Sequence, residues 1–271
     1  MLKRNINSAL IKIHIIPEDP ILVKSGQATV GGTDMSFVRT YRFGEKSEPF
    51  LPGSSLKGMI RSYAEKICRS LYSEPIPVCL PYLDPDKADG SDVRQASCGL
   101  YFEKIKKNFE INDLSTSAAY KLSCAACRLF GSHVFIGRFS VSDAYLTDEF
   151  KKGFVTEIRD GVAIDRLTGS TAGSAKFDLE VLTRGEFETQ ISIRNFERWQ
   201  IGLIGLILRD MEENLLRIGF GKSRGLGGFK IKIPEFKITS YGAPMLVFCG
   251  ISKRCSDEEN MDYGFARSSF F

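Results

Sequence analysis

Two long amphipathic segments separated by strand-like segments constrain the fold of this chain more than any other feature. The first follows a Pro-Gly turn and reads SSLKGMIRSYAEKICRSLY from Ser54, so Ser54 or Ser55 is expected to cap a helix. The second is Glu197–Asn214. Apolar residues recur in both at helical spacing and should face a core. They are Leu56, Ile60, Ala64, Ile67, Leu71, Trp199, Leu203, Leu206 and Ile207.

Short segments with the composition and alternation of strands surround these helices. They are Ala9–Ile16, Phe135–Leu146, Phe177–Leu182, Glu188–Ile193 and Phe229–Ile233. Two helices interleaved with antiparallel strands predict an α+β fold, a modified ferredoxin-like or RNA-recognition-motif-like core with the helices on one face. His14, in the first apolar strand, is expected in the core, although the same position can face an RNA.

The length of 271 residues favours one core with insertions over two domains. We expect that core at residues 1–240 and a C-terminal extension at 241–271. Residues 75–127 carry prolines, aspartates and four cysteines with little periodicity, which predicts a lid inserted outside the sheet. Residues 155–180 include a run rich in Gly, Ser and Thr and predict an exposed hairpin.

A glycine-rich basic loop, IGFGKSRGLGGFKIKI, is the clearest functional marker. Between Arg217 and Lys237 there are six basic residues and one acid, and Lys222, Ser223 and Arg224 lie among the glycines. Backbone N–H groups of such a loop can bind phosphate. A nucleotide-binding P-loop is excluded, because position 216 is leucine and a strand follows. A hairpin turn without a ligand remains the alternative.

The start of the first helix is a second candidate anion site. The sequence PGSSLKG places free N–H groups and the hydroxyls of Ser54 and Ser55 at a helix N-terminus. Lys57 and Arg61 lie one turn apart and can project together. Ordinary helix capping with exposed basic residues is the alternative.

Asp34 ends the turn Gly-Gly-Thr-Asp. A carboxylate in such a turn is commonly structural. The alternative is a catalytic or metal-binding aspartate beside a bound phosphate.

Cys124 and Cys127 have the two-residue spacing of a metal knuckle, and Cys79 and Cys98 lie upstream in the same insertion. Four thiolates can hold a structural zinc ion that stabilises a polar segment. His133 is an alternative ligand, and free buried thiols are the alternative to a metal site.

Several functional classes are disfavoured. Two histidines in the whole chain leave a Ser-His-Asp or Cys-His site poorly supplied. The sequence contains no run of about 18 apolar residues, so no membrane span is predicted. The basic N-terminal segment lacks the pattern of a signal peptide, so a cytoplasmic location is expected.

Five stretches together resemble the RAMP superfamily of CRISPR-associated proteins, and in particular the backbone subunit of type III CRISPR effector complexes. These stretches are VGGTD, LPGSSLKGMIR, CAACRLFG, DGVAIDRLTGSTAGSAKFDLEVL and GFGKSRGLGGFKIKI. The fourth resembles the thumb hairpin of that family. The resemblance implies an RNA-recognition fold whose copies stack on guide RNA with other effector subunits and pair it with complementary target RNA.

The resemblance also implies roles for individual residues. Asp34 would cut target RNA at regular intervals with Mg²⁺ or another divalent cation. The residues expected to contact guide RNA are Ser54, Ser55, Lys57, Arg61, Lys222, Ser223 and Arg224, and those on the thumb are Ile164, Asp165 and Arg166. The alternatives are an RNA-binding subunit that does not cut and, less well supported, an endoribonuclease that matures guide RNA.

Overall fold

A computed structural model describes residues 4–26, 33–42, 47–71, 78–81, 97–108 and 115–241. The predicted extension 241–271 lies almost wholly outside the described residues, as do Gly31 and Gly32 and much of the predicted lid. The helices are α1 (Gly53–Leu71), α2 (Cys98–Asn108), α3 (Thr116–Leu122), α4 (Ala125–Phe130), α5 (Arg198–Glu212) and the 3-10 turn η2 (Lys222–Arg224). The strands are β1 (Asn7–Pro17), β2 (Arg39–Thr40), β3 (Glu48–Leu51), β4 (Gly131–Ser132), β5 (Phe135–Ile136), β6 (Phe139–Val141), β7 (Ala144–Leu146), β8 (Val155–Ile164), β9 (Thr171–Arg184), β10 (Phe187–Arg194) and β11 (Phe229–Ser240).

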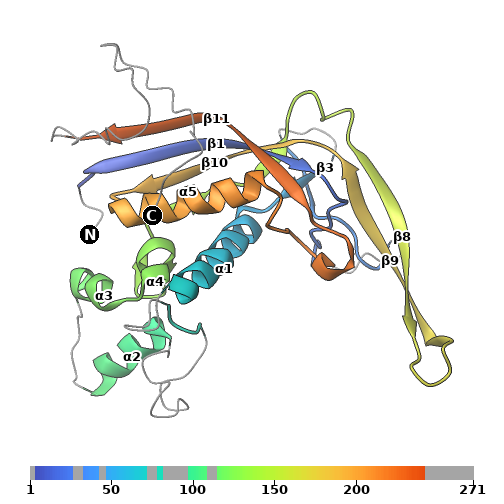
Figure 1. Ribbon diagram of the computed structural model, residues 1–271, viewed down its shortest axis with the longest axis horizontal. Helices are drawn as coiled ribbons and strands as arrows, with labels where there is room; N and C mark the ends of the chain where they lie inside the picture. The colour runs from blue at the N-terminus through green and yellow to red at the C-terminus, as the bar shows by residue number, and fades with distance from the viewer. Residues whose placement is uncertain are drawn as a thin grey trace.

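The main sheet has the order β11-β1-β10-β7-β3-β2, with β6 also paired to β10. All of these pairings are antiparallel. We count β1, β7, β10 and β11 as the first to fourth core strands. Their order across the sheet is then fourth, first, third and second, as in a ferredoxin-like βαββαβ unit. Figure 1 shows α1 and α5 on one face of this sheet. The predicted α+β, ferredoxin-like class is confirmed.

The core forms between the helices and the odd-numbered face of β1. Ala9, Ile11, Ile13 and Ile15 are each at most 1% exposed. Their partners on β10 are Ile193, Ile191, Thr189 and Phe187, in strict antiparallel register. Because side chains alternate along a strand, this register buries one face of β1 and leaves the other half-buried.

Some predicted core positions are wrong. Leu71 and Leu206 are 65% and 40% exposed, because each lies on the outer side of its helix. His14 is also outside the core. It lies on the even-numbered face of β1, opposite the core, and its Nδ1 is 2.6 Å from Glu186 Oε1. Helical spacing and apolar neighbours were insufficient to identify the buried side of each element.

The insertions contain more regular structure than the sequence indicates. The predicted irregular lid carries α2, α3 and part of α4. The single strand expected at Phe135–Leu146 is divided into β5, β6 and β7, because β6 and β7 pair with different parts of β10. Strands β8 and β9 form a two-stranded hairpin that extends away from the sheet (Figure 1). Within the described ranges, no helix is long and apolar enough to cross a membrane.

The N-terminus of α1 is capped from a different part of the chain than the sequence predicts. The helix begins at Gly53, and the Gly53 N–H donates to Asp143 Oδ1 at 2.7 Å. A Cβ at Gly53 would lie 2.8 Å from the Val141 carbonyl oxygen, so only glycine allows this close approach. The predicted cap by Ser54 or Ser55 is wrong, because both serines lie inside the first turn.

Replacing Asp143 with alanine should lower the free energy of unfolding by about 1 kcal/mol, because the first N–H of α1 loses its acceptor. Ser54→Ala is the matched control and should change the stability by less than about 0.5 kcal/mol. Denaturant unfolding of both variants measures the difference. Equal losses in the two variants would contradict the assignment of Asp143 as the cap.

Candidate RNA interface

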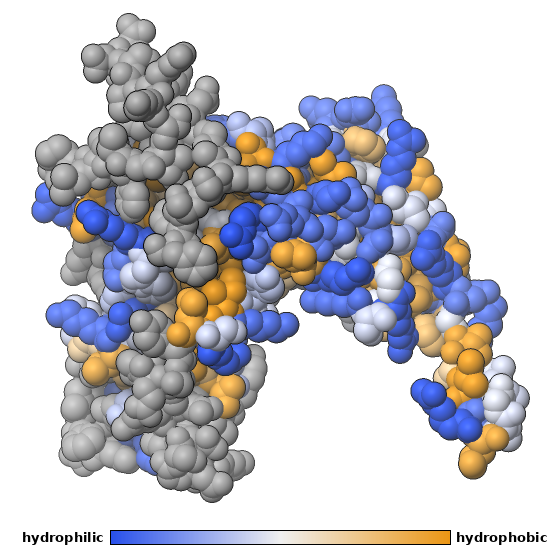
Figure 2. All heavy atoms as spheres, viewed as in Figure 1, coloured by the Kyte–Doolittle hydropathy of each residue, from blue (hydrophilic) through white to orange (hydrophobic). Residues whose placement is uncertain are grey.

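The β8–β9 hairpin presents apolar side chains to solvent. Ile158, Ile164 and Leu167 are 66%, 63% and 96% exposed, and Figure 2 shows apolar residues among polar ones at the hairpin's outer end. The same view shows the molecule hollowed between this hairpin and the helical insertion. A polypeptide ribbon with unpartnered apolar side chains suits insertion into another surface.

The tip of the hairpin is held by Asp165. Its Oδ1 accepts the N–H groups of Leu167 and Thr168 at 2.7 and 3.0 Å, and these bonds lower the pKa of the carboxyl. Asp165 therefore closes the turn, whereas its neighbours Ile164 and Arg166 are exposed. The structure thus presents Ile164 and Arg166 for contact and assigns Asp165 to the turn itself.

Asp34 lies against the hairpin about midway along β9, beside Asp178. Its Oδ2 accepts the backbone N–H of Asp178 on β9 at 3.1 Å, and the side chain is exposed. The next residue, Met35, forms a parallel bridge with Leu179. The Asp34 carboxylate is thus fixed against the hairpin while remaining accessible.

Two further carboxylates lie near Asp34, although they are distant in sequence. Asp160 and Asp178 are directly opposite each other across the hairpin. The pKa of Asp178 is raised because its protonated carboxyl donates a hydrogen bond to the Asp160 carboxylate, and desolvation and the negative charges of Asp160 and Asp34 raise it further. This grouping cannot be read from the sequence, because only the hairpin register creates it.

The glycine-rich loop packs tightly against its own chain. A Cβ at Gly219 would lie 2.1 Å from the Leu22 carbonyl oxygen, and one at Gly227 would lie 2.2 Å from that of Ile218. Both glycines also have positive φ, at 78° and 89°. These glycines therefore serve internal packing, which differs from the expected approach of a ligand to their backbone.

Between those glycines, the turn η2 displays Lys222, Ser223 and Arg224 on the surface. Lys24 adds to this basic group, since its Nζ lies 3.7 Å from the centre of the Phe220 ring, while Arg224 lies 6.0 Å from the same ring. Lys24 was not identified from the sequence, where it stands almost 200 residues away. Together, Lys24, Lys222 and Arg224 form a cationic patch around an aromatic ring, which we call the Phe220 patch.

The segment that carries Lys24 also connects the Phe220 patch to the Asp34 turn. Ser25 N–H donates to the Ser36 carbonyl oxygen at 3.1 Å, and Val38 N–H donates to that of Val23 at 2.8 Å. On its other side, Phe220 N–H donates to Leu22 O at 2.7 Å. Backbone hydrogen bonds therefore connect the segment that carries Lys24 both to the glycine-rich loop and to the residues that follow Asp34.

The predicted contacts on α1 divide into two groups. Ser54 is exposed, and Ser55 and Lys57 are half-buried near the helix N-terminus. Burial lowers the pKa of Lys57, and the neighbouring charge of Arg61 lowers it further. Arg61 instead points toward the insertion, where it donates to Glu65 Oε1, Gly131 O and Cys127 Sγ at 3.0, 3.1 and 3.6 Å.

The structure brings all four predicted cysteines together. The sulfur atoms of Cys79, Cys98, Cys124 and Cys127 lie within 4.8 Å of one another. The sulfurs of Cys79 and Cys127 are 3.7 Å apart. Four thiolates around a zinc ion, with Zn–S bonds of about 2.3 Å, form a tetrahedron whose edges are about 3.8 Å. The donor set and its spacing therefore fit a tetrahedral metal ion.

Backbone groups support the same arrangement. Cys127 N–H donates to Cys124 Sγ, and Cys124 N–H donates to Cys98 Sγ, each at 3.4 Å. Hydrogen bonds from the other three thiols lower the pKa of Cys124, which favours its thiolate form. His133 lies outside the four-sulfur group and packs against Gly99. His133 and Gly99 line a pocket of about 390 Å³ beside the cysteines.

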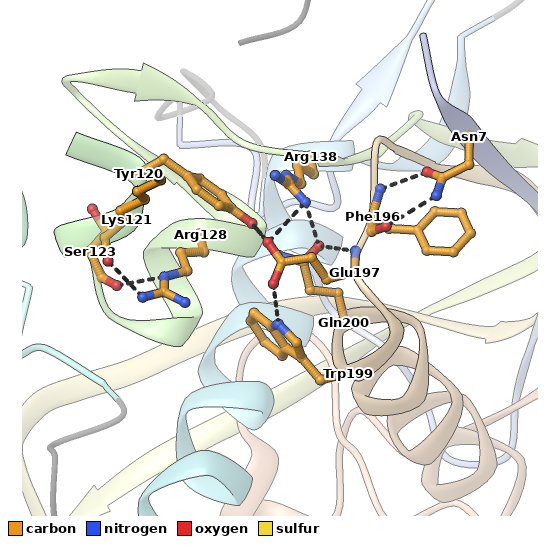
Figure 3. A network of polar contacts seen from close by, with 10 residues as sticks. All are labelled: Asn7, Tyr120, Lys121, Ser123, Arg128, Arg138, Phe196, Glu197, Trp199 and Gln200. Carbon is orange, nitrogen blue, oxygen red and sulfur yellow. Dashed lines mark hydrogen bonds and ion pairs between the residues drawn. The ribbon is translucent and has the colours of Figure 1, made fainter. Parts of the chain in front are cut away.

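A polar network attaches this cysteine-bearing insertion to the core (Figure 3). The Glu197 carboxylate, at the start of α5, accepts hydrogen bonds from Tyr120 on α3, from Arg138 and from Trp199. Gln200 is fully buried and donates to the Tyr120 hydroxyl at 3.2 Å. Burial and the bond to Glu197 raise the pKa of Tyr120 to about 12. The insertion is thus attached to the core at two points, through Arg61 of α1 and through this network.

Comparison with known proteins identifies the family. A sequence model of the RAMP superfamily matches residues 18–230, a range that includes the Asp34 turn, α1, the cysteine cluster, the hairpin and the glycine-rich loop. A search of curated proteins finds no match. With its ferredoxin-like sheet and its basic, aromatic surface, the chain belongs to the RAMP superfamily and is a CRISPR-associated, RNA-binding complex subunit.

Proposed function

We propose that this chain is the guide-RNA-binding backbone subunit of a type III CRISPR interference complex, and that it cleaves complementary target RNA at regular intervals. The observation that carries the proposal is the position of Asp34, an exposed carboxylate held against the middle of a projecting hairpin. In this proposal the hairpin inserts where guide and target pair. One hairpin per stacked copy would then give one cut per copy.

The chemistry of Asp34 suits target cleavage. A carboxylate oxygen is a preferred ligand of Mg²⁺, and a bound divalent ion would stabilise the charge that develops on the phosphate. The hydrogen bond from Asp178 orients the carboxylate, and the positive Phe220 patch nearby attracts the RNA backbone. The contribution of the protein is to hold a distorted strand beside an oriented acid group.

We assign guide binding to two surfaces, the Phe220 patch and the N-terminus of α1. The Phe220 patch offers exposed cations beside an aromatic ring, a combination that binds phosphates and stacks bases. Ser54, Ser55 and Lys57 supply donors at the α1 N-terminus. Because such contacts are made to the RNA backbone, the subunit would accept any guide sequence.

A second candidate is an RNA-binding subunit that does not cut. The hydrogen bond between Asp178 N–H and Asp34 Oδ2 favours it, because this bond alone gives Asp34 a structural role in closing the turn. The two candidates differ in what they require of Asp34. Cleavage needs a negative charge, whereas the turn needs only an acceptor oxygen.

Asp34→Asn separates these candidates, because the amide oxygen can still accept the Asp178 N–H but the charge is lost. If Asp34 is catalytic, the assembled complex should lose target cleavage by on the order of 100-fold or more, with guide binding and Tm unchanged. The measurement is cleavage of labelled complementary RNA in Mg²⁺ by complexes carrying Asp34→Asn or Asp34→Ala. Wild-type cleavage by both variants would show that Asp34 is not catalytic and would favour the second candidate.

Removing a cation from the Phe220 patch should weaken guide binding for all sequences alike. Lys24→Ala, Lys222→Ala and Arg224→Ala should each raise the Kd for guide RNA and reduce the slope of log K against log salt by about 1. Lys121→Ala, an exposed lysine on α3, serves as a matched control. An unchanged salt slope in all three patch variants would remove the patch from the guide path.

We infer that the four cysteines hold a structural zinc ion. Thiolate ligands and tetrahedral spacing favour zinc over hard cations such as Mg²⁺. The ion would stabilise an insertion with few buried apolar residues, since the small cluster around it contains six buried residues in the described ranges, and two of these are the ligands Cys79 and Cys127. Arg61, which donates to Cys127 Sγ, would offset part of the negative charge of the tetrathiolate site.

Purified protein should contain about one zinc ion per chain, and Cys124→Ser should remove it. A chelator should lower the Tm of the wild type but leave that of Cys124→Ser unchanged, because metal binding contributes folding free energy. Cys68→Ala is the control, since Cys68 is buried in the main core outside the four-sulfur group. Full zinc content in Cys124→Ser would contradict the assignment.

A further inference from the structure

Glu180 on β9 connects the Asp34 turn to the hairpin through its backbone and its side chain. Its N–H donates to the Met35 carbonyl oxygen at 3.0 Å, and its Oε2 accepts the Phe37 N–H at 3.0 Å. Its other oxygen forms an ion pair with the Arg39 guanidinium. The Glu180 side chain is only 15% exposed, so these contacts are partly shielded from water. These contacts reach every second residue after Asp34, namely Met35, Phe37 and Arg39.

The carboxylate supplies an acceptor where the backbone pairing ends. The Asp34 turn meets β9 through a single parallel bridge, between Met35 and Leu179. Phe37 is 1% exposed, and its other backbone neighbour, Lys24, pairs on the opposite side. A buried N–H without an acceptor destabilises the folded state. Glu180 therefore continues the contact between turn and hairpin with its side chain.

The same carboxylate reaches the strand that leads to α1. Arg39 begins β2, which pairs with β3, and β3 ends directly before α1. One acidic side chain of the hairpin thus contacts the segment that runs from the Asp34 turn toward the helix assigned to guide binding. A displacement of the turn by about 1 Å from a reacting group can reduce a rate by about 100-fold.

The geometry points to Glu180 as a positioning residue that sets the Asp34 carboxylate relative to the hairpin. This inference rests on the proposed cleavage function and goes beyond it by naming the group that orients the cleaving turn. Glu180 acts through Phe37 and Arg39 and does not itself contact RNA.

The test compares four variants in the complex assembled on guide RNA. They are Glu180→Ala, Glu180→Gln, Arg39→Ala and the control Glu157→Ala, which removes an exposed glutamate from the same hairpin. Three quantities are measured: the single-turnover rate of target cleavage, the affinity for guide RNA, and amide hydrogen exchange of residues 33–39.

Glu180→Ala should slow cleavage by on the order of 100-fold and speed exchange in residues 33–39, with guide affinity unchanged. Glu180→Gln should recover most of the rate, because its amide oxygen still accepts the Phe37 N–H. Arg39→Ala should show a smaller loss than Glu180→Ala for the same reason. Glu157→Ala should behave as the wild type.

Wild-type cleavage by Glu180→Ala would overturn the inference. So would a parallel loss of guide affinity, cleavage and Tm in both Glu180 variants, because that pattern indicates a general structural role. If the wild type does not cleave, the proposed function fails separately. Hydrogen exchange then decides the positioning role: faster exchange of residues 33–39 in Glu180→Ala supports it, and unchanged exchange overturns it.

Discussion

The pairing of β1 with both β10 and β11 is the interaction on which the rest of the structure depends. β1 places its odd-numbered apolar residues against α1 and α5, and its two partners are the last strands of the core to be synthesised. The glycine-rich loop enters β11 directly, so its position follows from this pairing. The hairpin likewise leads into β10. Both functional projections are therefore anchored to the same central strand.

The segment just after β1 joins these projections into one surface. It bonds to the glycine-rich loop at Leu22, to the Asp34 turn at Ser25 and to β9 at Ile21. Each contact is made mainly by backbone groups, so many side chains would satisfy it. Side-chain chemistry enters at few points, of which Glu180 and Lys24 are the clearest. A rigid backbone frame with a few oriented side chains is what positioning an RNA strand requires.

The cysteine-bearing insertion follows a different physical principle. Its apolar cluster in the described ranges is small, so burial alone contributes little to its stability. Four sulfurs hold its segments together, and hydrogen bonds of Tyr120 with Glu197 and Gln200 attach it to the core. Arg61 links the sulfur cluster to α1, the helix whose other end lies near the proposed guide path. This arrangement holds the insertion against one side of α1.

The sequence by itself determined the elements whose signals are local. Helical spacing predicted α1 and α5, alternation predicted β1 and β10, and the Cys124–Cys127 spacing indicated a metal knuckle. Only the tertiary structure decided what depends on partners distant in the chain. Asp143 caps α1, Lys24 completes the Phe220 patch, and Asp178 and Glu180 hold the Asp34 turn. The physical reason is that capping, charge clustering and hydrogen bonding require proximity in space, which strand register creates and sequence separation conceals.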